Sequence, residues 1–145
     1  MKKDLTITEI SAFEKGAEQK RPLFIARVQA GFPSPADDFV ENKLDLNEHL
    51  IKHPSATFFV KVEGESMREA GIYSGDTLIV DRALKASNNR VVIAAINGEL
   101  TVKRIKKSGT KIYLMPENRE FSPIDVTEDS SFEVWGVVTY VIHKL

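Results

Sequence analysis

The chain has 145 residues, a formal net charge of −1 and a hydrophobic share of 42%. This length suits a single domain with a proper core, and the composition excludes an intrinsically disordered chain. The small net charge gives no support to binding of nucleic acid or a membrane surface by bulk electrostatics. The sequence has no cysteine, which excludes disulfides, thiolate catalysis and thiolate metal sites.

The first 30 residues are polar and show only weak apolar periodicity. Asp4, Glu9 and Glu14 interrupt every apolar run, so this block has the pattern of neither a secretory signal nor a membrane anchor. No stretch elsewhere approaches the ~18 apolar residues that span a bilayer. We therefore expect a cytoplasmic protein in which residues 1–30 form a loosely attached, flexible arm. Within it, LFIARV (23–28) can pair as a short strand.

The heptapeptide QAGFPSP (29–35) ends this block. Gly31 allows almost any backbone angle, while Pro33 and Pro35 prevent continuation as a helix or a central strand. One interpretation is a plain linker into the following domain. The other is that the Ala30–Gly31 bond is presented for cutting, which requires a catalytic site elsewhere in the chain.

Past the prolines, Asp45 and Glu48 have the spacing of a capping box, and Pro54 stops the helix predicted for residues 46–52. Runs rich in aromatic and β-branched residues then predict strands. These are 56–63, 76–81, 90–96, 100–105, 111–115 and 132–142. Asn97-Gly98 between two of them favours a tight hairpin. The pattern predicts a mostly β domain of curled antiparallel strands with one or two short helices.

Histidine is a weak candidate for catalysis or metal binding. His49 and His53 are spaced like a zinc pair, but HLIKH has Leu50 where a metalloprotease needs a glutamate base. A solvated helix face is the better interpretation of this pair. No serine sits in a Gly-x-Ser-x-Gly elbow, although the presence of three histidines (His49, His53 and His143) leaves a Ser-His-Asp triad open.

The stretch EGESMREAG (63–71) directly follows a predicted strand. Gly64 allows a sharp turn there, and Ser66 can point its hydroxyl into a cleft. The backbone amides of Ser66 and Met67 are then candidate oxyanion donors, because developing negative charge needs fixed N–H groups nearby. The alternative is a polar turn with a hydroxyl cap.

A serine nucleophile needs a base, and lysine can serve where desolvation favours its neutral form. Lys103 lies in the predicted strand LTVKRI (100–105), just after the Asn97-Gly98 turn. Strand alternation places Thr101 and Lys103 on one face, opposite Leu100 and Val102. An ordinary exposed strand lysine is the alternative.

In order and spacing these features resemble the LexA/UmuD superfamily of self-cleaving Ser-Lys peptidases, and its UmuD branch most closely. The stretches that carry the resemblance are AGFPSPADDFVENKLDLNEHLIKHPSATFFVKVEGESM, GDTLIVDRALKAS, ELTVKRI, PENREFSPI and FEVWGVVTYVI. They cover nearly everything from Ala30 to the carboxyl end. The first 29 residues resemble the family only in length and polarity.

The resemblance implies a β-clip fold shared with signal peptidases, and it assigns the site residues. Ser66 is the expected nucleophile, Lys103 the general base and Ala30–Gly31 the scissile bond. Cleavage would separate a 1–30 arm from a 31–145 peptidase-like domain. LexA-type repressors also have alanine at the cut, whereas UmuD of enteric bacteria has cysteine there; both residues are small.

The resemblance further implies a role in the SOS response to DNA damage. The expected partners are a second copy of the chain, a UmuC-type Y-family translesion polymerase, and RecA on single-stranded DNA, which stimulates cleavage. No cofactor, metal or membrane contact is expected. We also do not expect a repressor, because the 30 residues before the Ala30–Gly31 bond show no helix-turn-helix pattern. Two alternatives stay open: a catalytically silent polymerase-binding dimer module, or a signal-peptidase-like processing enzyme, which needs a membrane anchor.

Overall fold

The computed structural model describes residues 2–14, 20–24 and 40–145, which fall into two compact units. One unit contains the described residues up to Phe13 together with Ser55–Leu145, and the other contains those between Glu14 and Pro54. Ala30 and Gly31 lie outside the described residues.

The smaller unit is a two-stranded ribbon followed by a short helix. Strand β2 (Lys20–Phe24) pairs antiparallel with β3 (Val40–Asp45), and helix α1 (Leu46–Leu50) follows directly. The Asp45 side chain accepts a hydrogen bond from the Asn47 amide at 2.9 Å, so the predicted cap is confirmed. The helix ends at Leu50 rather than at residue 52, because Ile51 already has an extended backbone.

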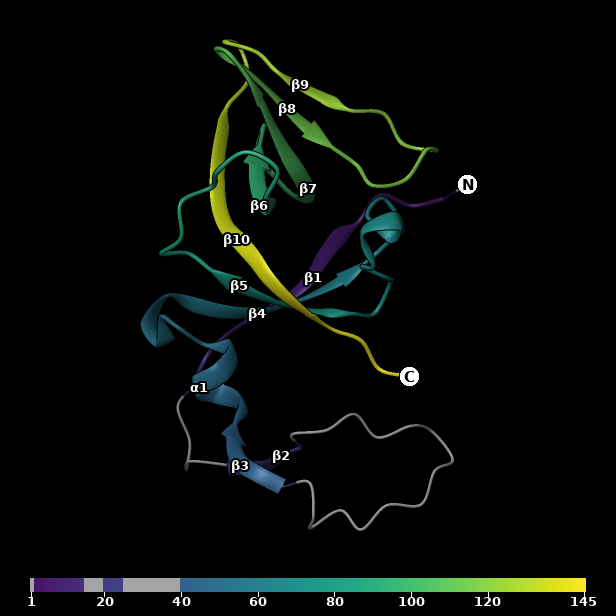
Figure 1. Cartoon of the computed structure of the whole chain (residues 1–145). Coiled ribbons are helices and arrows are strands. Elements are labelled where there is room, and N and C mark those ends of the chain that lie inside the picture. Colours follow the sequence, from purple (N-terminus) through teal and green to yellow (C-terminus); the bar gives the residue numbers. More distant parts are fainter. Residues whose placement is uncertain (1, 15–19, 25–39) are drawn as a thin grey trace. The chain divides into compact units, whose positions relative to one another are not determined.

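The larger unit is one antiparallel sheet of eight strands that curls on itself (Figure 1). Its strand order is β1-β4-β5-β10-β6-β7-β8-β9. The strands are β1 (Thr6–Ala12), β4 (Thr57–Glu63), β5 (Thr77–Asp81), β6 (Val91–Ile96), β7 (Glu99–Ser108), β8 (Lys111–Met115), β9 (Ile124–Val126) and β10 (Phe132–Ile142). Two 3-10 turns, η2 (Pro54–Ala56) and η3 (Arg68–Ala70), flank β4. The prediction of a mostly β fold of curled antiparallel strands is therefore confirmed.

Strand β10 joins the two halves of this sheet. Its first half pairs with β6 and its second half with β5, and both pairings contain a register shift. Gly136 lies at one of these irregularities, where a Cβ atom would come within 2.6 Å of Val80 Cγ1. Only glycine lets the strand cross so close to β5.

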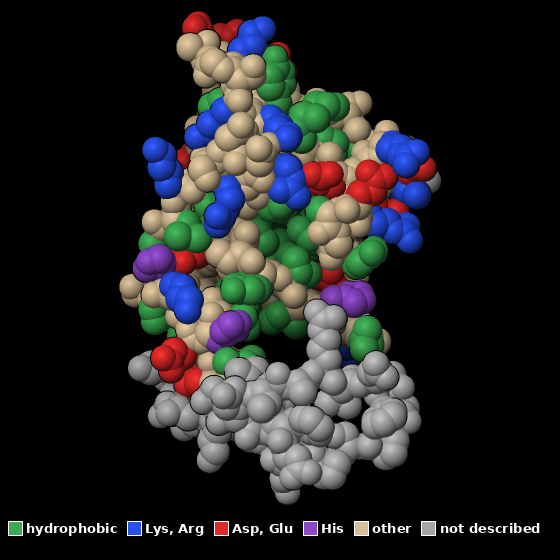
Figure 2. Space-filling view, in the orientation of Figure 1, with side chains coloured by type: hydrophobic (Ala, Val, Ile, Leu, Met, Phe, Trp, Pro, Cys, Tyr) green, Lys and Arg blue, Asp and Glu red, His purple; other side chains and the backbone are tan. Residues whose placement is uncertain are grey.

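Apolar side chains are buried on both faces of the sheet. Val92 and Ala94 of β6 belong to one cluster with Leu114, while Ile93 belongs to the other cluster with Val60 and Val102. Alternate residues of a strand point to opposite faces, so β6 is covered on both sides. On the face shown in Figure 2, charged side chains of both signs lie over the larger unit with hydrophobic ones between them.

The prediction of a loosely attached first block is wrong for residues 6–12. These residues form strand β1, which pairs with β4 along its length, and the preceding Leu5 is buried in the core with only 1% exposure. The six predicted strands are all present. The sequence pattern did not predict β1, β3 or β9. Of the predicted strand LFIARV, the structure describes Leu23 and Phe24, which form the end of β2.

Candidate active site

Ser66 lies in the turn between β4 and η3. Gly64 begins this turn with a φ of +121°, a backbone conformation that favours glycine. A loop after β8 fixes the turn from the other side: the Glu117 amide donates to the Ser66 carbonyl at 2.8 Å, and Asn118 Nδ2 donates to the Glu65 carbonyl at 2.8 Å. Ser66 is completely buried.

Lys103 reaches the same place from β7. It pairs with Val92 of β6 and has only 2% exposure, so it is not an ordinary surface lysine. Its Nζ atom donates to Thr101 Oγ1 at 2.7 Å. The predicted alternation, which puts Thr101 and Lys103 on one face, is therefore confirmed.

The fold brings Lys103 and Ser66 together across 37 residues of sequence. Lys103 Nζ lies 3.3 Å from Ser66 Oγ, within hydrogen-bond distance. A serine hydroxyl beside an amine is the arrangement that lysine-assisted nucleophilic catalysis requires, once the amine is neutral. Thr101 adds an acceptor that orients the amine.

Asp4 is a fourth charged or polar group at this site, beside Ser66, Lys103 and Thr101, and the sequence pattern did not indicate it. Its Oδ1 atom accepts a hydrogen bond from Lys103 Nζ at 2.8 Å. The next residue, Leu5, donates its amide to Ser66 Oγ at 3.0 Å. The one signal for this arrangement is the apolar pattern of LTITEI (5–10), which is compatible with a strand directly after Asp4.

The Asp4 carboxyl has a pKa lowered from its usual value. Partial burial by itself raises the pKa of Asp4, because it disfavours the charged form. Hydrogen bonds from Lys103 and Ser66, the charge of Lys103 and the Leu5 amide together outweigh that effect. Asp4 is therefore held as a carboxylate next to the Lys103 amine.

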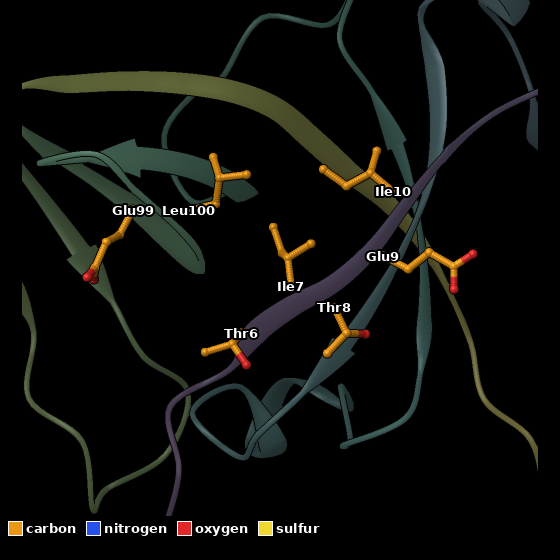
Figure 3. Close-up of a pocket in the computed structure, with 7 residues that line it drawn as sticks. All are labelled: Thr6, Ile7, Thr8, Glu9, Ile10, Glu99 and Leu100. Atoms are coloured by element: carbon orange, nitrogen blue, oxygen red, sulfur yellow. The ribbon is translucent and has the colours of Figure 1, made fainter.

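The larger unit has a cavity of about 580 Å³. It is bordered by residues 6–10 of β1 and by Glu99 and Leu100 at the start of β7. A register shift between Ile7 and Glu9 allows Ile7 and Ile10 to project to the same side of β1 (Figure 3). Neither Ser66 nor Lys103 lines this cavity, in keeping with their burial.

Within the larger unit, Ser66 has Lys103 as its basic partner, whereas His143 Nδ1 pairs with Asp76 Oδ1 at 2.6 Å. His49 lies on α1 in the smaller unit. No three His, Asp or Glu side chains of the described residues are grouped to hold a metal ion. In the same part of the chain, no helix has the length and apolar character needed to cross a membrane.

The curled antiparallel sheet of the larger unit is the fold of a peptidase-like β domain. The family described as peptidase S24-like matches residues 22–139, and the chain belongs to this family. The matched range includes both Ser66 and Lys103.

Three relatives narrow the assignment. Protein ImpA of Salmonella typhimurium is 47% identical over 86% of this chain and 84% of its own length. Protein SamA of Salmonella typhimurium (strain LT2) is 44% identical over 90% of this chain and 91% of its own length. A LexA repressor of Pseudomonas chlororaphis is 38% identical over 93% of this chain and 67% of the repressor. ImpA and SamA are UmuD-family proteins, and the LexA repressor is the most distant of these three relatives. The predicted membership of the LexA/UmuD superfamily is thus confirmed.

Proposed function

We propose that this UmuD-like chain cleaves its own Ala30–Gly31 bond, with Ser66 as nucleophile and Lys103 as general base. The observation that carries the proposal is the buried Lys103 amine, whose Nζ lies 3.3 Å from Ser66 Oγ. At this distance the amine and the hydroxyl are close enough for direct proton transfer between them. The bond itself lies in the sequence between the paired strands β2 and β3.

The reaction follows from these two groups. Neutral Lys103 takes the Ser66 proton while Oγ bonds to the Ala30 carbonyl carbon. The C–N bond to Gly31 then breaks, and the new amine of Gly31 takes the proton from Lys103. Water hydrolyses the Ser66 ester in a second step that uses the same base. The products are residues 1–30 and residues 31–145.

The negative charge that develops on the Ala30 oxygen needs hydrogen-bond donors. The backbone amides of Ser66 and Met67 are the proposed donors, because they lie in the turn that carries the nucleophile. Among the described residues, neither amide donates to another backbone group, which supports this role.

The proposed biological role rests on the similarity to UmuD-type relatives. We propose that the chain acts as a homodimer in SOS mutagenesis, and that RecA on single-stranded DNA stimulates the cleavage. The 31–145 product then joins a UmuC-type Y-family polymerase for synthesis past lesions. The similarity to UmuD-type relatives over most of the chain supports this role.

The test is the mass of purified protein after incubation with RecA, ATP and single-stranded DNA. We expect fragments that end at Ala30 and begin at Gly31, and their absence in Ser66→Ala and Lys103→Ala. Lys106→Ala is the matched control, since Lys106 lies on the same strand but bonds to the exposed Asn89. An intact wild type would instead favour a catalytically silent polymerase-binding module. Cleavage of an added peptide but not of the chain itself would favour a signal-peptidase-like processing enzyme.

A further inference from the structure

Residues 3–5 run directly across the serine–lysine site. The Glu65 amide donates to the Lys3 carbonyl at 2.9 Å, and the Leu5 amide donates to Ser66 Oγ at 3.0 Å. Thr6 then pairs with Glu63 as β1 begins. An extended segment of the chain is thus bound along the end of β4 and over the nucleophile.

Gly64 makes this close approach possible. A Cβ atom at Gly64 would come within 2.1 Å of the Asp4 carbonyl oxygen and 2.6 Å of Leu5 Cα. Contacts that short are impossible without movement of the backbone. The absence of a side chain at Gly64 is therefore needed for residues 3–5 to pass, as well as for the turn itself.

The bound segment excludes a substrate from the nucleophile. A peptide carbonyl must come within ~3–3.5 Å of Ser66 Oγ to react, and the Leu5 amide already lies at 3.0 Å. Ser66 and Lys103 have exposures of 0% and 2%. The Ala30–Gly31 bond therefore reaches the site only when residues 3–5 have moved away.

The Asp4 carboxylate also opposes the neutral amine that catalysis needs. It accepts a hydrogen bond from Lys103 Nζ at 2.8 Å. A nearby negative charge favours the ammonium form of lysine, whereas a general base must be neutral.

We propose that the segment Lys3–Leu5 is a built-in inhibitor of the Ser66–Lys103 site, and that Asp4 is its inhibitory group. The inference rests on the proposed self-cleavage and adds its regulation: the chain holds itself in a latent state until this segment leaves. Among the described strands, β1 lies at the edge of the eight-stranded sheet and pairs with β4, so its departure leaves the other seven strands of that sheet paired.

The other charged groups around this segment are paired with one another, which leaves Asp4 as the partner of Lys103. Lys2 lies 3.0 Å from Glu120 and 3.9 Å from Glu65, Lys3 lies 4.0 Å from Glu63, and Arg104 of β7 pairs with Glu117. If removal of the Asp4 carboxylate changes the pH dependence of cleavage, the cause is therefore the loss of its contact with Lys103.

The experiment compares full-length wild type, Asp4→Asn and Glu9→Gln in self-cleavage without RecA, over a pH series from neutral to strongly alkaline. Asp4→Asn keeps the shape of the side chain and removes its charge. We expect its cleavage profile to move to lower pH by about one unit, which is about a tenfold higher rate at a pH on the rising limb. Glu9→Gln removes one charge from β1 at an exposed pair with Lys61 and should match wild type. Equal profiles for Asp4→Asn and wild type would overturn the proposal.

A second measurement does not need cleavage. Acetylation of Lys103 by acetic anhydride at mildly alkaline pH, followed by mass spectrometry, reports how far the amine is exposed and neutral. We expect Asp4→Asn and Asp4→Ala to increase Lys103 labelling several-fold over wild type and Glu9→Gln. Unchanged labelling would count against the inhibitor even if the chain cleaves itself. Increased labelling without any fragment at any pH would support the inhibitor and reject the proposed self-cleavage.

Discussion

Thr101 Oγ1 lies 2.7 Å from Lys103 Nζ, closer than Ser66 Oγ at 3.3 Å. The Thr101 and Lys103 side chains lie two residues apart on β7 and project to the same buried face. The threonine hydroxyl therefore aims the amine at the serine, whichever protonation state the lysine has. Thr101 does not touch the scissile bond in the proposed reaction, so it acts as a positioning residue.

The first prediction concerns this contact. Thr101→Val keeps the volume and the branched shape but removes the acceptor, so Lys103 Nζ loses one of its three partners. We expect self-cleavage to slow by about tenfold and stability to fall by about 1 kcal/mol, the usual value of one hydrogen bond. Thr101→Ser should restore most of the rate. The measurement is the rate of fragment formation at alkaline pH, and an unchanged rate in Thr101→Val would show that the hydroxyl is not needed to aim the amine.

The second prediction tests the base through its charge. Self-cleavage without RecA should rise with pH, because only the neutral amine can take the Ser66 proton. Lys103→Ala should abolish it, and Lys103→Arg should do the same because the guanidinium stays protonated. Lys106→Ala serves as the control on the same strand. A rise centred near ~6.5 that persists in Lys103→Ala would point to a histidine base instead.

Local sequence signals were enough to locate most of the strands and to make Ser66 and Lys103 candidates, while their proposed roles came from the family resemblance. Asn97 and Gly98 adopt φ values of +50° and +83°, as the tight hairpin between β6 and β7 requires. That hairpin sets the register that aligns Lys103 with Val92. The Gly64-led turn after β4 likewise depends on neighbouring residues alone, so its position could be predicted from the sequence.

The Asp4–Lys103 contact could not be predicted in that way. It joins residues 99 positions apart, and a polar segment with scattered charges carries no local mark of its partner. Strand β1 was missed for a related reason: most of its residues are exposed and its alternation is interrupted where the pairing with β4 shifts. Edge pairing is decided by the neighbouring strand rather than by the segment's own pattern.

The third prediction separates crowding from backbone strain at Gly64. Gly64→Ala adds a methyl group where Asp4 and Leu5 pass, whereas Gly75→Ala adds one at a similar positive φ with nothing within 4 Å. Both variants should lose about 1 kcal/mol from the strained backbone. Gly64→Ala should lose more, because the bound segment must also shift. Urea unfolding in the Ser66→Ala background measures the difference, and equal losses for the two variants would mean that residues 3–5 do not lie against Gly64 in solution.

The last prediction follows from the lowered pKa of Asp4 and concerns stability in acid. A carboxyl whose pKa is lower in the folded than in the unfolded state stabilises the fold above its unfolded pKa, near 3.8. That contribution is lost as the pH falls through the folded value. Because the Asp4 side chain is 48% exposed, solvent screening keeps the contribution to about 1 kcal/mol or less.

Asp4→Asn should therefore lower the urea midpoint slightly at pH 7 and leave it close to wild type near pH 2, where the wild-type carboxyl is also neutral. The comparison is made in the Ser66→Ala background so that no chain is cut during unfolding. Glu9→Gln should change little at either pH, because Glu9 and its partner Lys61 are both exposed. A midpoint for Asp4→Asn that is equal to or above wild type at pH 7 would mean that the carboxylate gains nothing from the Lys103 amine. In that case the pair would not hold residues 3–5 over Ser66.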